Sequence, residues 1–246
     1  MLIALLADIH ANREAFSASL AHAQAAGAQR YILLGDYVGY GADPGWAVDQ
    51  VMAMVDAGAI ALRGNHDEAV FNSAVQMNEL AQTAMEWTRR QLDDRQRTFL
   101  RNLPMVHEQG DWLCVHASAD EPSAWHYVIG PESASRSFMA TTARITVCGH
   151  VHVPALYHLS VTGKLAAFTP GTGDSVPLNR QRRWLAVMGS VGQPRDGQPA
   201  AAYGLFDDVA NTLTYMRVPY DAAGAAAKIT AAGLPPVLGL RLLSGR

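Results

Sequence analysis

The first part of the chain alternates short apolar runs with segments of helical periodicity, and this pattern constrains the fold more than any other feature. The apolar runs are Leu2–Ala7, Tyr31–Leu34 and Ala59–Leu62. Helices are predicted between them, over Asn12–Ala26 and from Pro44 to about Ala57, because each periodic segment ends at a glycine. The alternation predicts βαβ units, whose parallel strands bring their carboxyl ends to one edge of a sheet.

The remainder of the chain predicts a second sheet and further helices. Helical spacing over Asn78–Leu92 and Asp94–Asn102 predicts a helical cap or flank within residues 77–104. Strands are expected at Met105–His107, Trp112–Val115 and Ile145–Cys148, and a helix at Glu132–Thr142. After Val153 the pattern predicts mostly antiparallel strands, followed by C-terminal helices within residues 222–246. The fold class predicted is α/β, a four-layer α/β/β/α sandwich of two mixed β-sheets flanked by helices, in a single domain over residues 1–246.

Composition excludes several classes of protein. With 246 residues and 49% hydrophobic residues, the chain is long enough to bury a substantial core. Its formal net charge of −3 supplies no general basic field for wrapping nucleic acid or binding an anionic membrane. Cys114 and Cys148 lie in apolar runs and are expected to be reduced, buried thiols. The first apolar run is too short for a membrane span and has no basic segment before it, so we expect a cytoplasmic protein; the oligomeric state stays open.

Side chains that bind metal ions follow the ends of five predicted strands. The candidate ligands are Asp8, His10, Asp36, Asn65, His116, His150 and His152. Strand alternation is expected to aim Asp8 and His10 the same way, and His150 and His152 likewise, because each pair is two residues apart. Gly64 is expected to allow a tight turn before Asn65. A site for two metal ions explains this set, and oxygen with imidazole ligands suits Mn²⁺, Fe, Zn²⁺, Co²⁺ or Ni²⁺.

The motifs DxH, GD, GNHD, a lone His and GHxH occur in this order between Asp8 and His152. In this respect the chain resembles the calcineurin-like metallophosphoesterase superfamily. Over Val51–Leu103 and in its tail, with Trp87-Thr88-Arg89, Leu103-Pro104 and the stretch Gly189–Gly197, it resembles a prokaryotic branch of small phosphodiesterases. The resemblance implies that Asp8, His10 and His152 hold one metal ion, that Asn65, His116 and His150 hold the other, and that Asp36 bridges them. It also implies hydrolysis of a phosphoester by a metal-bridging hydroxide.

Two neighbouring residues are expected to act on the substrate side. The resemblance implies that His66 helps to protonate the leaving group, for which a pKa near the usual value of about 6.5 is suitable. Asp67 is expected either to orient the His66 imidazole as part of the catalytic machinery or to cap a helix that starts near Glu68.

The substrate is less tightly constrained by the motifs. Protein Ser/Thr phosphatases of the superfamily carry Asp-Arg where this chain has Gly39-Tyr40. The resemblance to the small phosphodiesterases implies that the loop Gly189–Gly197 returns to the metals with Arg195 as the phosphate clamp, and the alternative is an exposed loop with a solvated arginine. Asn12 is expected to contact substrate or, more simply, to cap the following helix. We predict hydrolysis of phosphodiesters of small or nucleotide-like substrates. The alternatives are a dinucleoside polyphosphate hydrolase, a phosphoprotein phosphatase and a metal-bound scaffold without catalysis.

Overall fold

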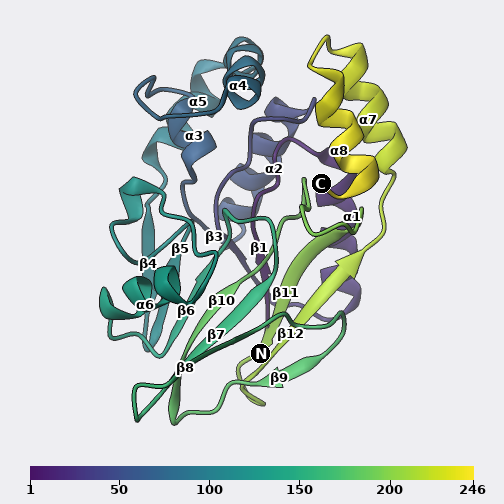
Figure 1. The fold of residues 1–246 in the computed structure, drawn as a ribbon. Coiled ribbons are helices and arrows are strands. Elements are labelled where there is room, and N and C mark those ends of the chain that lie inside the picture. The colour runs from purple at the N-terminus through teal and green to yellow at the C-terminus, as the bar shows by residue number, and fades with distance from the viewer.

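The computed structural model describes residues 1–246 and contains two six-stranded mixed sheets (Figure 1). The first sheet has the order β3 (Ile60–Ala61), β2 (Arg30–Leu33), β1 (Leu2–Leu6), β11 (Ala201–Asp207), β12 (Thr212–Val218) and β9 (Ser175–Pro177). The second sheet has the order β4 (Val106–Gln109), β5 (Trp112–Val115), β6 (Ile145–Cys148), β10 (Arg182–Val187), β7 (Ala155–Ser160) and β8 (Leu165–Phe168).

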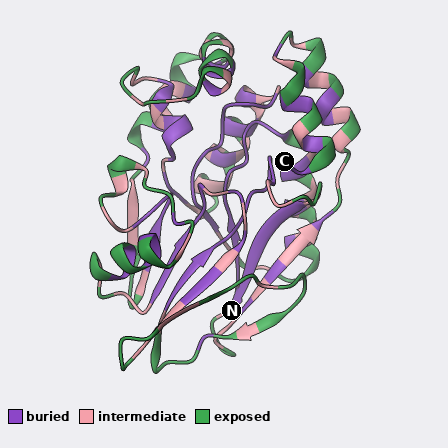
Figure 2. Ribbon diagram, viewed as in Figure 1, coloured by how far each residue is buried: buried purple, intermediate pink, exposed green.

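Helices cover the outer faces of both sheets, which confirms the predicted four-layer α/β/β/α arrangement. Helices α1 (Arg13–Ala25) and α2 (Pro44–Asp56) share a hydrophobic cluster with the first sheet, and α6 (Pro131–Met139) shares another with the second. A third cluster fills the space between the sheets. The central strands of both sheets are accordingly among the most buried parts of the ribbon, whereas the edge strands β4, β8 and β9 are partly exposed (Figure 2).

Strand β1 shows why the sequence reads as a continuous apolar run. Ile3 and Leu5 belong to the cluster between the sheets, whereas Ala4 and Leu6 belong to the cluster beneath the helices. Alternate side chains of a strand point to opposite faces, so a strand buried on both faces needs apolar residues at every position.

The parallel part of each sheet brings several strand ends to one edge. In the first sheet β1 pairs in parallel with β2, and β2 with β3. In the second sheet β6 pairs in parallel with both β5 and β10. The chain after Val153 is therefore not purely antiparallel, because β10 joins β6 in the parallel direction while pairing with β7 in the antiparallel one.

The remaining helices lie at the same end of the molecule as these strand ends (Figure 1). They are α3 (Asn65–Ala69), α4 (Glu79–Gln91), α5 (Asp94–Asn102), a 3-10 turn at Pro122–Ala124, α7 (Ala222–Ala231) and α8 (Pro236–Ser244). Helices α4 and α5 pack against α2, and α5 also packs against α3. Helix α3 begins at Asn65 rather than near Glu68, and neither β9 nor the 3-10 turn was expected from the sequence.

The two cysteines are free and buried, as predicted. Burial raises the pKa of Cys114 to about 12, so this thiol stays protonated and packs as a small apolar group. None of the helices combines the length with the apolar composition needed to span a bilayer.

Candidate metal centre

The candidate ligands predicted from the sequence come together where the parallel strands of both sheets end. Asp8 follows β1, Asp36 follows β2 and Asn65 is the first residue of α3, just after β3. His116 follows β5, while His150 and His152 follow β6. All seven residues, Asp8, His10, Asp36, Asn65, His116, His150 and His152, are buried. Residues as far apart in the chain as Asp8 and His152, which are separated by 144 positions, thus share one small volume.

The ligand atoms fall into two main clusters. Asp8, His10 and His152 form the first cluster, and Asp36, His116 and His150 form the second, with the ligand atoms of each within 4.8 Å of one another. Asn65 joins the second cluster, because its Oδ1 lies 3.1 Å from Nε2 of His116.

The Asp36 carboxylate lies between the two clusters. Its Oδ2 is 3.7 Å from Nε2 of His10 and 3.4 Å from Nε2 of His116. Its Oδ1 accepts a hydrogen bond of 2.8 Å from the backbone N–H of His66, which fixes the orientation of the carboxylate. One oxygen is therefore held by the backbone while the other faces histidines of both clusters.

Backbone carbonyls fix the tautomers of three histidines. Nδ1 of His10 lies 3.0 Å from the carbonyl oxygen of Val38, and Nδ1 of His116 lies 2.8 Å from that of Leu34. Nδ1 of His152 lies 2.7 Å from the carbonyl oxygen of Gln193. A carbonyl can only accept, so each Nδ1 carries the hydrogen and, in the neutral ring, each Nε2 presents a lone pair to the centre.

The first cluster therefore contains a contact that a cation would resolve. Nε2 of His10 and Nε2 of His152 are 3.0 Å apart, and two lone pairs at this distance cannot hydrogen-bond to each other. Burial lowers the pKa of both imidazoles well below the usual value, so protonation does not relieve the contact at neutral pH. A metal ion between the two nitrogen atoms would accept both lone pairs.

The buried acids require positive charge in the same volume. Burial raises the pKa of Asp8 to about 8, which reflects the cost of an uncompensated carboxylate. Burial also lowers the pKa of His116, but the neighbouring Asp36 carboxylate outweighs it and raises that pKa to about 9. The donor set, with carboxylates, neutral imidazoles and an amide oxygen, fits first-row transition metals.

The side chains are aimed by left-handed backbone turns rather than by strand alternation. The φ angles are 55° at Asp8, 48° at His10, 59° at Asp36, 67° at His150 and 64° at His152. Non-glycine residues rarely adopt these angles, which cost of order 1–3 kcal/mol each. The expectation that two-residue spacing in an extended strand orients Asp8 with His10, and His150 with His152, is therefore wrong, since the strands end before these residues.

Glycines allow the loops to approach each other closely. Gly64 has an extended conformation, with φ −99° and ψ 175°, so the predicted tight turn is not the reason for a glycine there. A Cβ atom at Gly64 would collide with the side chain of Asp36. The glycine is needed because the Asp36 carboxylate packs directly against the backbone that precedes Asn65.

The Asp67 carboxylate accepts hydrogen bonds from backbone N–H groups and does not orient His66. Its Oδ2 accepts hydrogen bonds from the N–H groups of Asp36 (2.8 Å) and Gly64 (2.9 Å), and its Oδ1 accepts one from Tyr37 (2.9 Å). The bond to Gly64 is a capping interaction at the start of α3, so the capping alternative describes the observed contacts. Asp67 thereby joins the loop after β2 to the loop after β3.

His66 lies beside the first cluster and packs against the rings of Tyr40 and His10. Its ring centroid is 4.6 Å from that of Tyr40 and 4.8 Å from that of His10. Its Nδ1 is buried without a hydrogen-bond partner and faces Gly39, where a Cβ atom would collide with it. Burial lowers the pKa of His66 to about 4, well below the value near 6.5 expected from the sequence. A ring nitrogen of His66, a ring nitrogen of His10 and a carboxylate oxygen of Asp36 also lie within 4.8 Å of one another, so these three residues are close enough to bind one metal ion.

The loop Gly189–Gly197 returns to the centre. The hydroxyl of Ser190 and the N–H of Gly192 each donate a hydrogen bond of 2.8 Å to the carbonyl oxygen of Asp8. Arg195, further along this loop, lies with its guanidinium 5.7 Å from the Tyr40 ring centroid and donates a bond of 2.9 Å to Oε1 of Gln193. A positive charge thus stands at the Tyr40 side of the centre.

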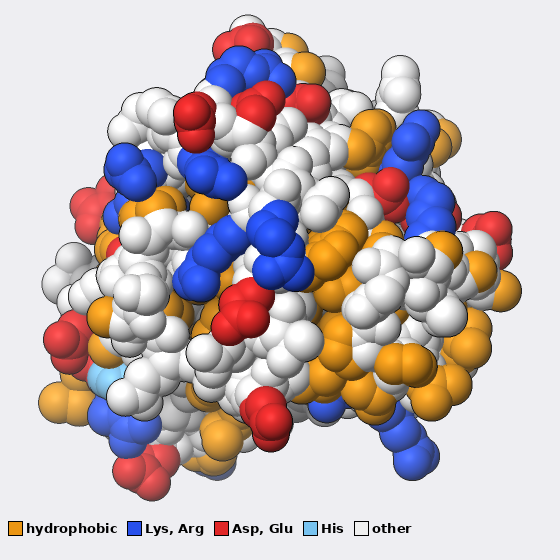
Figure 3. Space-filling model, turned by 90° about the horizontal axis from the view of Figure 1, so that it is seen from above, with side chains coloured by type: hydrophobic (Ala, Val, Ile, Leu, Met, Phe, Trp, Pro, Cys, Tyr) orange, Lys and Arg blue, Asp and Glu red, His pale blue; other side chains and the backbone are white.

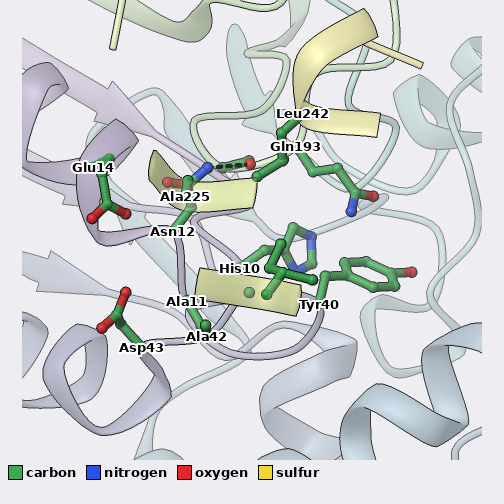
Figure 4. Close-up of a pocket in the computed structure, with 13 residues that line it drawn as sticks. His10, Ala11, Asn12, Glu14, Tyr40, Ala42, Asp43, Gln193, Ala225 and Leu242 are labelled. Atoms are coloured by element: carbon green, nitrogen blue, oxygen red, sulfur yellow. Dashed lines mark hydrogen bonds between the residues drawn. The ribbon is translucent and has the colours of Figure 1, made fainter. Parts of the chain in front are cut away.

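Asn12 is fully engaged by the protein. Its Oδ1 accepts from the N–H of Ala15 as the N-cap of α1, and its Nδ2 donates a 2.8 Å bond to the carbonyl oxygen of Gly192. Figure 4 shows this bond at the wall of a small pocket formed by the His10–Asn12 turn, the segment after Tyr40 and helices α7 and α8. These contacts fit the capping interpretation of Asn12.

Three aromatic residues at the centre were not expected from the sequence. In the sequence, Tyr40 was notable only because protein Ser/Thr phosphatases have an arginine at this position. Neither Trp125 nor Tyr127 belongs to a motif. Tyr127 stacks on His150, with ring centroids 4.1 Å apart, and Trp125 lies edge-to-face with His116 at 5.8 Å. The only sequence feature that indicates them is the tripeptide Trp-His-Tyr, in a segment for which no helix or strand was predicted.

Comparisons with known proteins identify the family and the fold of the chain. The family model described as "calcineurin-like phosphoesterase superfamily domain" matches residues 1–209. An uncharacterised protein of Methanocaldococcus jannaschii is 32% identical over 251 residues, covering 100% of this chain and 98% of that protein. A metallophosphoesterase structure from Sphaerobacter thermophilus shows 34% identity and a TM-score of 0.88, covering 100% of this chain and 99% of that one. A hypothetical protein from Pyrococcus horikoshii shows 18% identity and a TM-score of 0.79, covering 100% and 98%, which supports the fold.

Proposed function

Since the chain belongs to the calcineurin-like phosphoesterase superfamily and is a phosphoester hydrolase, we propose that it cleaves phosphodiesters of small or nucleotide-like substrates at a dinuclear metal centre. The observation that carries the dinuclear proposal is the Asp36 carboxylate, which faces histidines of two separate clusters. A cytoplasmic location stays a prediction.

Each cluster would hold one ion. Asp8, His10 and His152 would hold the first and Asn65, His116 and His150 the second, with the Asp36 carboxylate shared between them. Ions of the Mn, Fe, Zn, Co or Ni type would supply Lewis acidity for the phosphoryl oxygens and for a water nucleophile. The backbone carbonyls at Val38, Leu34 and Gln193 hold the ligating rings in the required tautomer.

His66 acts on the leaving group in this proposal. Its lowered pKa makes the imidazole neutral at pH 7, so it donates a hydrogen bond from its N–H to the departing oxygen instead of carrying a charge to it. The packing of His66 between Tyr40 and His10 holds the ring in place without a carboxylate partner. Asp67 contributes indirectly, by fixing the loops that carry Asp36 and His66.

Arg195 stabilises the phosphoryl oxygens. Its guanidinium stands over Tyr40 on the side of His10 and His152, and its Nε is buried without a partner, so the group retains donors for an anion. Tyr40 occupies the place of the arginine of protein phosphatases, which argues against the phosphoprotein phosphatase alternative.

A substrate panel on metal-loaded protein tests this proposal. We expect hydrolysis of bis(4-nitrophenyl) phosphate to exceed that of 4-nitrophenyl phosphate, and both to depend on added metal. A marked preference for the monoester would overturn the phosphodiesterase assignment. Preferential cleavage of a dinucleoside polyphosphate would favour the second enzymatic alternative, and no hydrolysis at all would favour a metal-bound scaffold.

The role of His66 is tested by replacement. We expect His66→Ala to lower kcat by about 10²–10³-fold, the usual cost of losing one hydrogen-bond donor to a developing negative charge, while the bound metal measured by elemental analysis is retained. His107→Ala, in the edge strand β4, is the matched control and is expected to keep full activity. Undiminished hydrolysis in His66→Ala would remove the leaving-group role.

A further inference from the structure

A groove opens beside the second metal cluster and shares two of its residues. It has a volume of about 480 Å³ and is lined by Asn65 and His150, by the aromatic residues Trp125 and Tyr127, and by polar side chains of the segment after α3. This volume is typical of sites for small organic ligands, which span about 300–1,000 Å³. We call it the aromatic groove.

Tyr127 is placed to stack with a planar ligand. One face of its ring covers the His150 imidazole, at a centroid distance of 4.1 Å and an interplanar angle of 24°. The side chain is nevertheless 51% exposed, so its other face is free. A ring that is already stacked on one side and open on the other forms a fixed platform.

Trp125 is held in an unfavourable backbone conformation at the same place. Its φ angle is 57°, in the left-handed region that bulky residues avoid. Its ring lies 5.8 Å from the His116 ring, so the two aromatic residues contact both imidazoles of the second cluster. Their placement joins the groove directly to the centre.

The charge of the groove selects against further phosphate groups. Glu68 is the one charged residue in its lining, and it pairs with Arg63 at 3.1 Å outside the lining. No lysine or arginine lines the groove. Ser123 and Gln76, in contrast, are exposed side chains of the lining that can bond to polar edges of a ligand.

We propose that the aromatic groove binds the nucleobase of a nucleotide phosphodiester, with the base on Tyr127 and Trp125 and a single phosphate at the metals. This inference rests on the proposed function for the position of the phosphate. It deepens that function by choosing nucleotide diesters over simple alkyl diesters. It also disfavours dinucleoside polyphosphates, because the groove offers no cation for a chain of phosphates.

Binding of matched ligands tests the groove without turnover. Isothermal titration calorimetry on the metal-loaded protein compares adenosine 5′-monophosphate with ribose 5-phosphate, which lacks the base. We expect the nucleotide to bind about tenfold tighter or more, as base stacking on aromatic side chains typically gives. Tyr127→Leu and Trp125→Leu are expected to bring the affinity ratio towards one, and Tyr127→Phe to preserve it.

Ile129→Ala is the matched control, because Ile129 lies in the same segment, is exposed and does not line the groove. It should keep the wild-type ratio. A ratio near one in the wild-type protein, or a ratio that survives both leucine variants, overturns the inference even if phosphodiesters are hydrolysed. Base-dependent binding without hydrolysis of any phosphodiester would instead remove the proposed function and leave the groove as a nucleotide site.

Discussion

At the residue scale, the metal centre depends on left-handed backbone conformations that the sequence does not predict. Asp8, His10 and Asp36 all have left-handed φ angles, and their strain is concentrated where the ligands converge. The glycines nearby serve a different purpose, since they give room for neighbouring loops. Gly39 is the clearest case, because its backbone lies directly against Nδ1 of His66 and leaves no room for a Cβ atom.

Replacement of Gly39 tests this contact. In Gly39→Ala the new methyl group must displace His66, so we expect kcat to fall about tenfold or more, since a positioned hydrogen-bond donor to a developing negative charge contributes about 10²–10³-fold. Metal content should stay near the wild-type value. Steady-state kinetics and elemental analysis measure the two effects.

Gly58→Ala separates displacement from backbone strain. Gly58 also has a positive φ, 97°, compared with 86° at Gly39, but a Cβ atom added there would have no neighbour within 4 Å. Both variants should lose about 1 kcal/mol of stability from backbone strain, and Gly39→Ala should lose more because it also displaces the buried His66 ring. Equal activity in the two variants would show that the Gly39–His66 contact is unimportant for catalysis.

At the element scale, the C-terminal helices support loops that carry the centre. The family model ends at residue 209, before α7 and α8. Lys228 of α7 nevertheless contacts Glu14 of α1 at 2.6 Å and Asp43, just before α2, at 2.9 Å. The carbonyl oxygen of Gly245 accepts from the N–H of Gly197 in the Arg195 loop. Hydrophobic side chains gather on the α7 and α8 side of the face seen in Figure 3.

Removal of the Lys228 charge tests this support. We expect Lys228→Met to lower the free energy of unfolding by about 0.5–1 kcal/mol, a modest value because the ammonium group is partly exposed and screened. Urea titration followed by circular dichroism measures the change. Lys164→Met is the control, since Lys164 is exposed and forms no ion pair; an equal loss in both variants would contradict the prediction.

At the scale of the whole molecule, the apolar layer between the two sheets ends at a buried polar centre at one end of the sandwich. Asp8 and Asp36 are at most 1% exposed, and both lie at the end of the sandwich where the strands of the two sheets converge. Buried carboxylates destabilise a fold unless positive charge compensates them. Bound metal should therefore contribute to the stability of the entire sandwich.

Metal removal tests this coupling. We expect dialysis against a chelator to lower Tm by several degrees, because a ligand at 100 times its Kd stabilises the folded state by about 2.7 kcal/mol and each kcal/mol corresponds to about 2–4 °C for a chain of this size. Scanning calorimetry measures the shift. In Asp36→Asn the metal-dependent part of Tm should shrink, and a shift as large as that of the wild-type protein would argue against Asp36 as a ligand.

The sequence by itself determined the sandwich architecture, the order of its elements apart from β9 and the 3-10 turn, and the identity of the converging side chains. These follow from local periodicity and from the rule that parallel strands end at a common edge, so residues such as Asp8 and Asp36 can be placed without coordinates. Only the tertiary structure decided how the side chains are used. The position of Asp36 between clusters, the grip of Asp67 on three backbone amides and the stacking of Tyr127 on His150 join residues far apart in the chain. Such contacts depend on loop conformation and on the meeting of two sheets, which local patterns do not encode.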